Sequence, residues 1–268
     1  MVGTERLKEE SLMSTLTNLQ IMWRSYSSQY DVHRASPQVS RETAAFREAA
    51  VSVKTVDDLI KNREVFNYVL KAYGMEDLPY PAMIKKILTD EDFSKGFVDS
   101  RYREFMEAMG FQKGGSGKFS DPAWIDEVVS RYQTVTFEER KGEEDANLRL
   151  AMYFERVAPT VENWYDVLAD KALSEVVFTS LGIDDQVRLG DIDKLAEMLE
   201  RRMSIEDFKN PDKVKSLVQR FAIFSDMETQ VSTNPVLQLY QASAGTGPRT
   251  IINIDSSLLA EANRLKFL

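Results

Sequence analysis

The chain has 268 residues, 43% of them hydrophobic, which is enough to bury the core of one large domain or two small ones. Its 34 basic and 43 acidic residues give a net charge of -9, which repels a phosphate backbone, and no long Lys/Arg run offsets it. No apolar stretch approaches the roughly 20 residues that cross a bilayer, and the N-terminus does not resemble a signal peptide. We therefore expect a cytoplasmic protein that neither binds nucleic acid nor inserts into a membrane.

Cysteine and histidine usage narrows the chemistry further. Without cysteine, the chain has no disulfide, thiol nucleophile, iron–sulfur cluster or common structural zinc site. Its single histidine, His33, lies in the polar stretch QYDVHRASPQ, where we prefer a solvated loop side chain over a general base. No catalytic residue, metal ligand or cofactor is expected, and only carboxylate, Lys, Tyr or Ser chemistry stays open.

The stretch GFQKGGSGKFSDP, residues 110–122, contains a Gly-Lys pair like that of a phosphate-binding loop. Such a loop also needs an upstream glycine at a fixed spacing and a Ser or Thr after the pair. Gln112 and Phe119 occupy these two positions, and the preceding residues have a helical pattern. We therefore interpret GGSGK as a flexible joint between two structural units.

Two segments of the chain resemble each other: VDDLIKNREVFNYVLKAYGMED, residues 56–77, and WYDVLADKALSEVVFTSLGIDD, residues 164–185. They align Gly74 with Gly182 at an offset of 108 residues (182 − 74). Apolar residues recur at helical spacing in both, which predicts amphipathic helices. Each glycine follows the last periodic residue, so both are predicted to end a helix as left-handed C′ residues.

Arginine also occurs at the same place in both copies, as Arg47 within AAFREAA and Arg149 within ANLRLAM. Each lies on an otherwise apolar helix face. This repetition indicates one structural role carried out twice, such as an internal ion pair or a cap on helix carbonyls, rather than catalysis. On this interpretation, Arg149→Met lowers the melting temperature.

The segments outside the copies carry helix signals of their own. Asp121 as N-cap and Pro122 at the first helical position begin a linker helix, which we expect to pack on one of the copies. Near the N-terminus, a heptad stripe is assigned to core packing in preference to a coiled-coil seam. The stripe consists of Leu12, Leu16, Leu19, Trp23, Tyr26 and Tyr30.

The tail, residues 226–268, contains a predicted extended segment, TIINID, and ends in SSLLAEANRLKFL, which predicts a short amphipathic helix. This helix either docks on the body of the protein, which we prefer, or binds a partner. Its candidate partner-binding residues are Leu258, Leu259, Leu265 and Leu268.

We therefore predict an all-α fold built from two tandem copies of a helical unit, joined by a linker helix and flanked by N- and C-terminal helices. The predicted divisions are an N-terminal helix in 1–40, a first copy in 41–115, a joint and linker helix in 116–142, a second copy in 143–225 and a tail in 226–268.

The order of these helix patterns resembles domain-of-unknown-function family 1217 of alphaproteobacteria over residues 40–224. The strings that carry the resemblance are RETAAFREA, VDDLIKNREVFNYVLKAYGMED, RYREFMEAMGF, YQTVTFEERKGEEDANLRLAMYFERVAP, WYDVLADKALSEVVFTSLGI and KVKSLVQRF. Members are often encoded in flagellar gene regions, so the resemblance implies a role in flagellar assembly or its regulation. It brings no catalytic residues with it.

One charge cluster, EERKGEEDANLR at residues 138–149, offers carboxylates for a metal or for acid–base work. Adjacent residues on a helix point in different directions, however, so Glu143, Glu144 and Asp145 do not converge. We interpret the cluster as a solvated helix start around Gly142.

The predicted function is non-enzymatic protein interaction or scaffolding, with other proteins, including flagellar components, as partners. The first alternative is a chaperone or regulator of flagellar export or expression. The second is an enzyme that uses carboxylates or lysines without a recognisable motif. The oligomeric state stays open.

Overall fold

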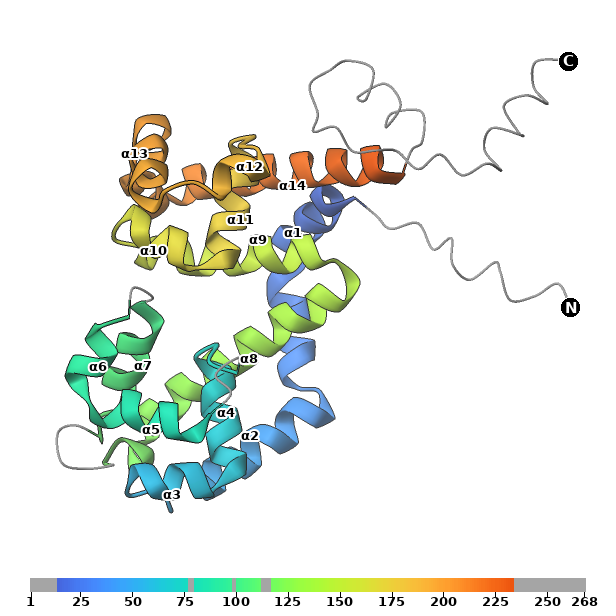
Figure 1. Cartoon of the computed structure of the whole chain (residues 1–268). Coiled ribbons are helices and arrows are strands. Elements are labelled where there is room, and N and C mark those ends of the chain that lie inside the picture. The colour runs from blue at the N-terminus through green and yellow to red at the C-terminus, as the bar shows by residue number, and fades with distance from the viewer. Residues whose placement is uncertain (1–13, 77–79, 98–99, 112–116, 234–268) are drawn as a thin grey trace, which may run out of the picture. The chain divides into compact units, whose positions relative to one another are not determined.

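The computed structural model describes residues 14–76, 80–97, 100–111 and 117–233, and within these ranges every regular element is a helix (Figure 1). The fold is all-α, as predicted. None of the described helices is long and apolar enough to span a bilayer. The TIINID segment and the candidate tail residues Leu258, Leu259, Leu265 and Leu268 lie outside the described residues.

A first hydrophobic core lies among helices α2 to α8 and includes the fully buried Phe46, Leu59 and Ile84. The elements before α8 that contribute to it begin and end as follows: α2 (Pro37–Ala50), α3 (Val56–Lys61), α4 (Arg63–Ala72), α5 (Pro81–Thr89), α6 (Glu91–Lys95), α7 (Ser100–Met109) and the 3₁₀ turn η2 (Gly117–Ser120).

A second core follows α8 and includes the buried Phe154, Val176 and Phe221. The elements that follow α8 and contribute to it are α9 (Ala146–Val157), η3 (Ala158–Thr160), α10 (Trp164–Ala169), α11 (Lys171–Ser180), α13 (Ile192–Arg202), η4 (Ile205–Lys209) and α14 (Pro211–Thr233). The short helix α12 (Asp185–Arg188) lies between α11 and α13 in the chain and buries no residue.

Helix α8 (Pro122–Glu144) contributes to both cores. It begins as predicted, with the Asp121 side chain accepting a hydrogen bond from the backbone N–H of Ala123. Its N-terminal part buries Trp124 and Tyr132 in the first core, and its C-terminal part buries Phe137 in the second. We expected this helix to link the two copies and to pack on one of them; it packs on both cores, because its apolar face extends past the first.

The N-terminal helix α1 (Thr15–Arg34) packs on the second core, in line with the preferred interpretation of its apolar stripe. The Asp226 carboxylate accepts hydrogen bonds from the backbone N–H groups of Thr15 (2.7 Å) and Leu16 (3.1 Å). A carboxylate at this end of a helix is favoured because the N–H groups there have no partner within the helix. The stripe residues that contact the second core are Leu16, Leu19, Trp23 and Tyr30.

Helices α4 and α11 end in the same way, at the offset of 108 residues that separates Gly74 from Gly182. Gly74 has φ 65° and Gly182 has φ 63°. In both cases the next residue, Met75 or Ile183, donates its N–H back to a carbonyl in the last helical turn, at 2.8 and 2.9 Å. These bonds form the Schellman arrangement, which uses the left-handed conformation that glycine adopts without strain.

Gly182→Ala is expected to lower the free energy of unfolding by about 1 kcal/mol, because an L-residue is strained at this φ. No atom lies within 4 Å of the added Cβ, so the loss comes from the backbone conformation alone. Gly117→Ala is the matched control, since Gly117 also has open space around it but no positive φ. Urea unfolding followed by circular dichroism compares the two, and equal losses would contradict the assignment.

The predicted joint is only partly described, because residues 112–116 lie outside the described ranges. Its last residues are packed: Phe119 in η2 is fully buried between Phe111 and Trp124. The Lys118 side chain passes over Gly110, and its Nζ donates to the carbonyl of Glu107 at 2.9 Å. Lys118 of the Gly-Lys pair therefore packs on the residue that ends α7 and bonds to its last turn.

Candidate functional site

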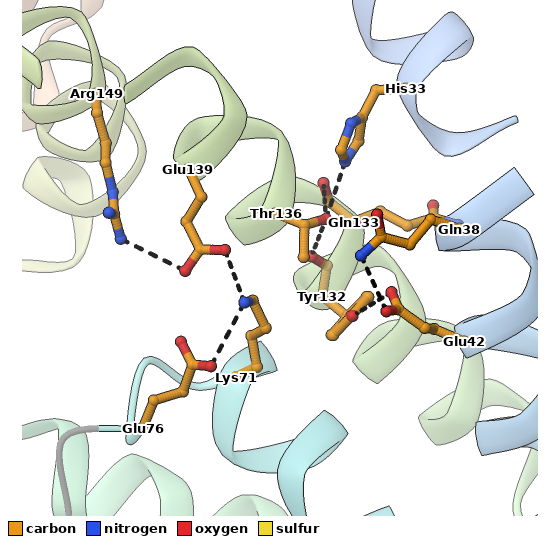
Figure 2. Close-up of polar contacts among 10 residues, drawn as sticks. All are labelled: His33, Gln38, Glu42, Lys71, Glu76, Tyr132, Gln133, Thr136, Glu139 and Arg149. Atoms are coloured by element: carbon orange, nitrogen blue, oxygen red, sulfur yellow. Dashed lines mark hydrogen bonds and ion pairs between the residues drawn. The ribbon is translucent and has the colours of Figure 1, made fainter. Parts of the chain in front are cut away.

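A hollow of about 350 Å³ lies over helices α2, α4 and α8, and its lining is mainly apolar. Residues from all three helices and from the turn after α4 line it, and Figure 2 shows several of them. The lining residues are Arg41, Glu42, Ala45, Phe46, Glu64, Asn67, Tyr68, Lys71, Glu76 and Tyr132.

Three stacked aromatic rings form the inner wall of the hollow. Tyr68 lies between Phe46 and Tyr132, with ring centroids 4.2 and 3.7 Å apart and nearly parallel planes. The Tyr132 hydroxyl donates to Glu42 at 2.6 Å, and that of Tyr68 pairs with Thr43 at 3.0 Å. Burial raises the pKa of both tyrosines, so both stay neutral at physiological pH. The wall is therefore an uncharged aromatic surface.

A chain of ion pairs crosses one side of the hollow and links the two halves of the fold. Lys71 lies between Glu139, at 2.8 Å, and Glu76, at 3.4 Å, and Arg149 contacts the other oxygen of Glu139 at 3.6 Å (Figure 2). Burial alone would lower the pKa of Lys71, but the hydrogen bond and charge of Glu139, together with Glu76, outweigh it and raise that pKa. Lys71 is therefore a fixed cation and is unsuited to act as a nucleophile or base.

Several polar side chains at the outer rim of the hollow form no ion pair with another described residue. Arg41 donates from Nε to the carbonyl of Pro37 at 3.0 Å, and among the described residues no carboxylate pairs with its guanidinium. Glu64 and Asn67 are exposed on α4 and likewise have no side-chain partner within the described ranges. The rim thus presents both charges and an amide toward solvent, around a largely apolar interior.

His33 is buried, which corrects the interpretation of it as a solvated loop residue. It is 6% exposed in the last turn of α1, with its ring against Phe137 at 5.4 Å. Its Nε2 lies 2.9 Å from the hydroxyl oxygen of Thr136, which itself donates to the carbonyl of Tyr132. Nε2 therefore carries the proton, and Nδ1 is buried without a partner within the described residues. Packing of α1 on α8 buries a side chain whose sequence neighbours are polar.

The free energy of unfolding is expected to fall as the pH drops below 6.5, because the pKa of His33 is lower in the folded protein than in the unfolded chain. Burial, followed by the charges of Arg140 and Lys141, lowers the pKa of His33 from its usual 6.5. The unfolded chain then takes up a proton that the folded chain does not, so the contribution is complete above pH 6.5 and is lost toward the lower folded pKa. Unfolding free energies of the wild type and His33→Gln, measured over this range, should diverge. Parallel pH profiles would contradict the assignment.

Arg47 on α2 and Arg149 on α9 are half-exposed and pair with opposite ends of α8. Arg47 pairs with Asp126 at 2.6 Å, and Arg149 pairs with Glu139, with side chains 45% and 51% exposed. Each arginine thus forms an ion pair within the chain, one of the two structural roles that we considered. The stem of Arg149 also packs on Gly142, where an added Cβ would come within 2.7 Å of it.

The charge cluster at residues 138–149 spans the end of α8 and the start of α9, and the helix starts at Ala146 rather than around Gly142, because α8 continues through Gly142 to Glu144. Glu143 and Glu144 are exposed, whereas Asp145 caps α9 and accepts a hydrogen bond from Asn18 in α1 at 2.9 Å. The described residues contain no group of His, Asp or Glu side chains arranged to hold a metal ion.

The hollow itself was not predicted from the sequence. Lys71 and Glu139 belong to different segments of the chain, and no periodicity connects them. The one available signal was Tyr132, which continues the apolar stripe of the linker helix while carrying a hydroxyl that needs a partner. The position of Tyr132 in this stripe indicated that its side chain is buried, but it did not indicate which helices pack around it.

Comparison with known proteins relates the chain to one family. The model of the family described as protein of unknown function (DUF1217) matches residues 72–214, more than half of the chain. The crystal structure of protein AGR_C_984 from Agrobacterium tumefaciens is 34% identical, with a TM-score of 0.72, and the match covers 80% of this chain and 94% of that one. No curated protein matches the chain. The chain therefore belongs to the DUF1217 family.

Proposed function

We propose that this chain is a non-enzymatic, cytoplasmic protein-interaction or scaffolding protein that holds another protein at the hollow on α2, α4 and α8. The observation that supports this is the combination of an aromatic inner wall with rim groups of both signs, Arg41 and Glu64, neither of which forms an ion pair with another described residue. A pocket of this kind suits an apolar anchor side chain surrounded by polar contacts. The ionisable groups deeper in the hollow already have partners: Lys71 pairs with Glu76 and Glu139, and Glu42 accepts a hydrogen bond from Tyr132.

The enzyme alternative receives less support from the same geometry. A general acid or base must reach the reacting atoms and titrate near the working pH. Around the hollow, Lys71 is held between two carboxylates, and Glu42 accepts hydrogen bonds from Tyr132 and Gln38 (Figure 2). We propose flagellar assembly as the process served, on the grounds of the family resemblance.

Affinity purification from cells that make the protein, followed by mass spectrometry, tests the proposal. Ala45→Trp places a large side chain in the hollow, whereas Ala44→Trp adds the same side chain at the neighbouring exposed position. We expect one protein to be retained by the wild type and Ala44→Trp and lost from Ala45→Trp, with both variants folded by circular dichroism. Recovery of the same proteins by all three would contradict a role for the hollow.

The proposed flagellar link is tested separately. Deletion of the gene is expected to impair swimming in soft agar, and a copy that encodes the Ala44→Trp variant should restore it, while the Ala45→Trp copy should not. Normal motility of the deletion strain would contradict the link to flagella without bearing on binding at the hollow.

A further inference from the structure

Four large apolar side chains are exposed on the second half, on α10, on α12 and in the turn and first residue that lead into α13. Leu189 is 88% exposed and Ile192 is 59% exposed, and Val187 and Tyr165 are each more than 40% exposed. Val187, Leu189 and Ile192 lie within one short stretch of chain, and the Tyr165 hydroxyl donates to Asp193 at 2.9 Å, which places this side chain at the start of α13, next to Ile192 in the sequence. We name these four residues the Leu189 patch.

The backbone that presents the Leu189 patch is held in place by several hydrogen bonds. Asp184 caps α12, Asp191 caps α13, and the N–H of Gly190 donates to the carbonyl of Val187 at 3.0 Å. Arg188, whose side chain is largely buried, anchors α12 to α11 through Glu175 and Thr179. The apolar side chains are thus exposed to solvent on a backbone that hydrogen bonds hold in one conformation. This arrangement is typical of an interaction site.

The rim of the Leu189 patch is acidic. Four exposed aspartates flank its residues in the sequence: Asp184, Asp185, Asp191 and Asp193, of which Asp185 is 89% exposed. Of the two cations in the same stretch, Arg188 is already paired with Glu175 and Asp185, which leaves Lys194 as the exposed positive charge. The local charge has the same sign as the net charge of -9 of the whole chain. A second copy of this chain is therefore disfavoured as the occupant, and a basic one is favoured.

We propose that the Leu189 patch docks a basic amphipathic helix of a partner protein. The apolar face of that helix covers Leu189 and Ile192, and its Lys or Arg side chains reach the surrounding aspartates. The inference rests on the proposed role in protein interaction but uses a surface on the second half, separate from the hollow of the first. The chain would then hold two proteins, or two segments of one protein, at the same time.

Fluorescence anisotropy with a labelled synthetic peptide tests this proposal on the full chain. The probe is an amphipathic helix of Leu and Lys, and its counterparts are a Leu/Glu helix with the same apolar pattern and a scrambled Leu/Lys sequence of the same charge. We expect the Leu/Lys helix to bind more tightly than either counterpart. The double variant Leu189→Ser with Ile192→Ser should weaken its binding by about tenfold or more, because two aliphatic side chains lose their contact.

The matched control is Val32→Ser, which removes another exposed aliphatic side chain, 69% exposed on α1, and should leave binding unchanged. Asp185→Asn should weaken binding at low salt and have less effect at high salt. Equal binding of the double variant and the wild type, or equal binding of the Leu/Glu and Leu/Lys helices, would overturn the proposal. Dimerisation of the wild type that is lost in the double variant would overturn it in favour of a second copy. None of these outcomes changes the comparison of Ala44→Trp with Ala45→Trp, which tests the hollow.

Discussion

Arg156→Met is expected to lower the free energy of unfolding by about 3 kcal/mol, because it leaves the Glu138 carboxylate buried without its partner. Arg156 in α9 donates from Nε and from one Nη nitrogen to the two oxygens of Glu138 in α8, at 2.6 and 2.8 Å. The Glu138 side chain is only 5% exposed. The Met side chain leaves this buried carboxylate without a charged partner, and its charge then opposes the packing of α9 on α8.

The control for this prediction is Arg149→Met, two turns earlier on the same helix. Arg149 pairs with Glu139 at 3.6 Å, and its side chain is 51% exposed, so we now expect a loss of at most about 1 kcal/mol. The double variant Glu138→Met with Arg156→Met should regain most of the stability lost in Arg156→Met, since no charge stays buried. Urea unfolding of these variants gives the comparison. Equal losses for Arg156→Met and Arg149→Met would contradict the assignment of the buried pair.

Phe137→Ala is expected to lower the free energy of unfolding by about 3–5 kcal/mol, the range for removing a large aromatic side chain from a core. The Phe137 ring is 1% exposed and contacts Tyr26 and Tyr30 edge to face at 5.6 Å, and also His33. All three partners lie on α1. The substitution therefore opens a cavity at the contact between α1 and α8.

Phe137→Leu serves as the control, because it keeps most of the buried apolar surface and should cost less. Hydrogen exchange gives a second readout. Amides of α1 should exchange faster in Phe137→Ala, while those of α3 and α4, which pack in the other core, should change less. A loss below about 1 kcal/mol, or a uniform rise in exchange, would show that Phe137 does not hold α1 in place.

Local features of the fold followed well from the sequence because they depend on neighbouring residues. The glycine ends of α4 and α11 need only a helix that stops and a residue that tolerates positive φ, and Gly74 and Gly182 meet that need. The start of α8 at Asp121 and Pro122 is equally local. The all-α class follows from the apolar spacing in the same way.

Features that depend on which helices pack together could not be predicted from the local sequence pattern. His33 is surrounded by polar residues in the sequence, yet the packing of α1 against Phe137 and Thr136 of α8 buries it. The length of α8 was underestimated at its C-terminal end because Gly142, a residue that favours interruption, is needed there for the close approach of Arg149. The Lys71–Glu139 pair joins α4 to α8 and has no counterpart in any periodic pattern.

The dual role of α8 bears on the proposed function. The same helix supplies Tyr132 to the wall of the hollow and Glu139 to the ion pairs beside it (Figure 2). It also supplies Phe137 to the second core. A partner bound at the hollow therefore contacts the helix that also supports α1 and α9. Such a position suits a scaffold, because the partner would bind to α8 at the first core, and the same helix is also held by packing in the second core.

Titration of the partner identified by affinity purification against the purified Ala44→Trp and Ala45→Trp proteins tests the account most directly. The two variants differ only in whether the added indole projects from an exposed position or into the hollow. We predict that Ala44→Trp binds with wild-type affinity and that Ala45→Trp binds at least about tenfold more weakly, because the anchor site is filled. Equal dissociation constants for the two variants would contradict binding at the hollow.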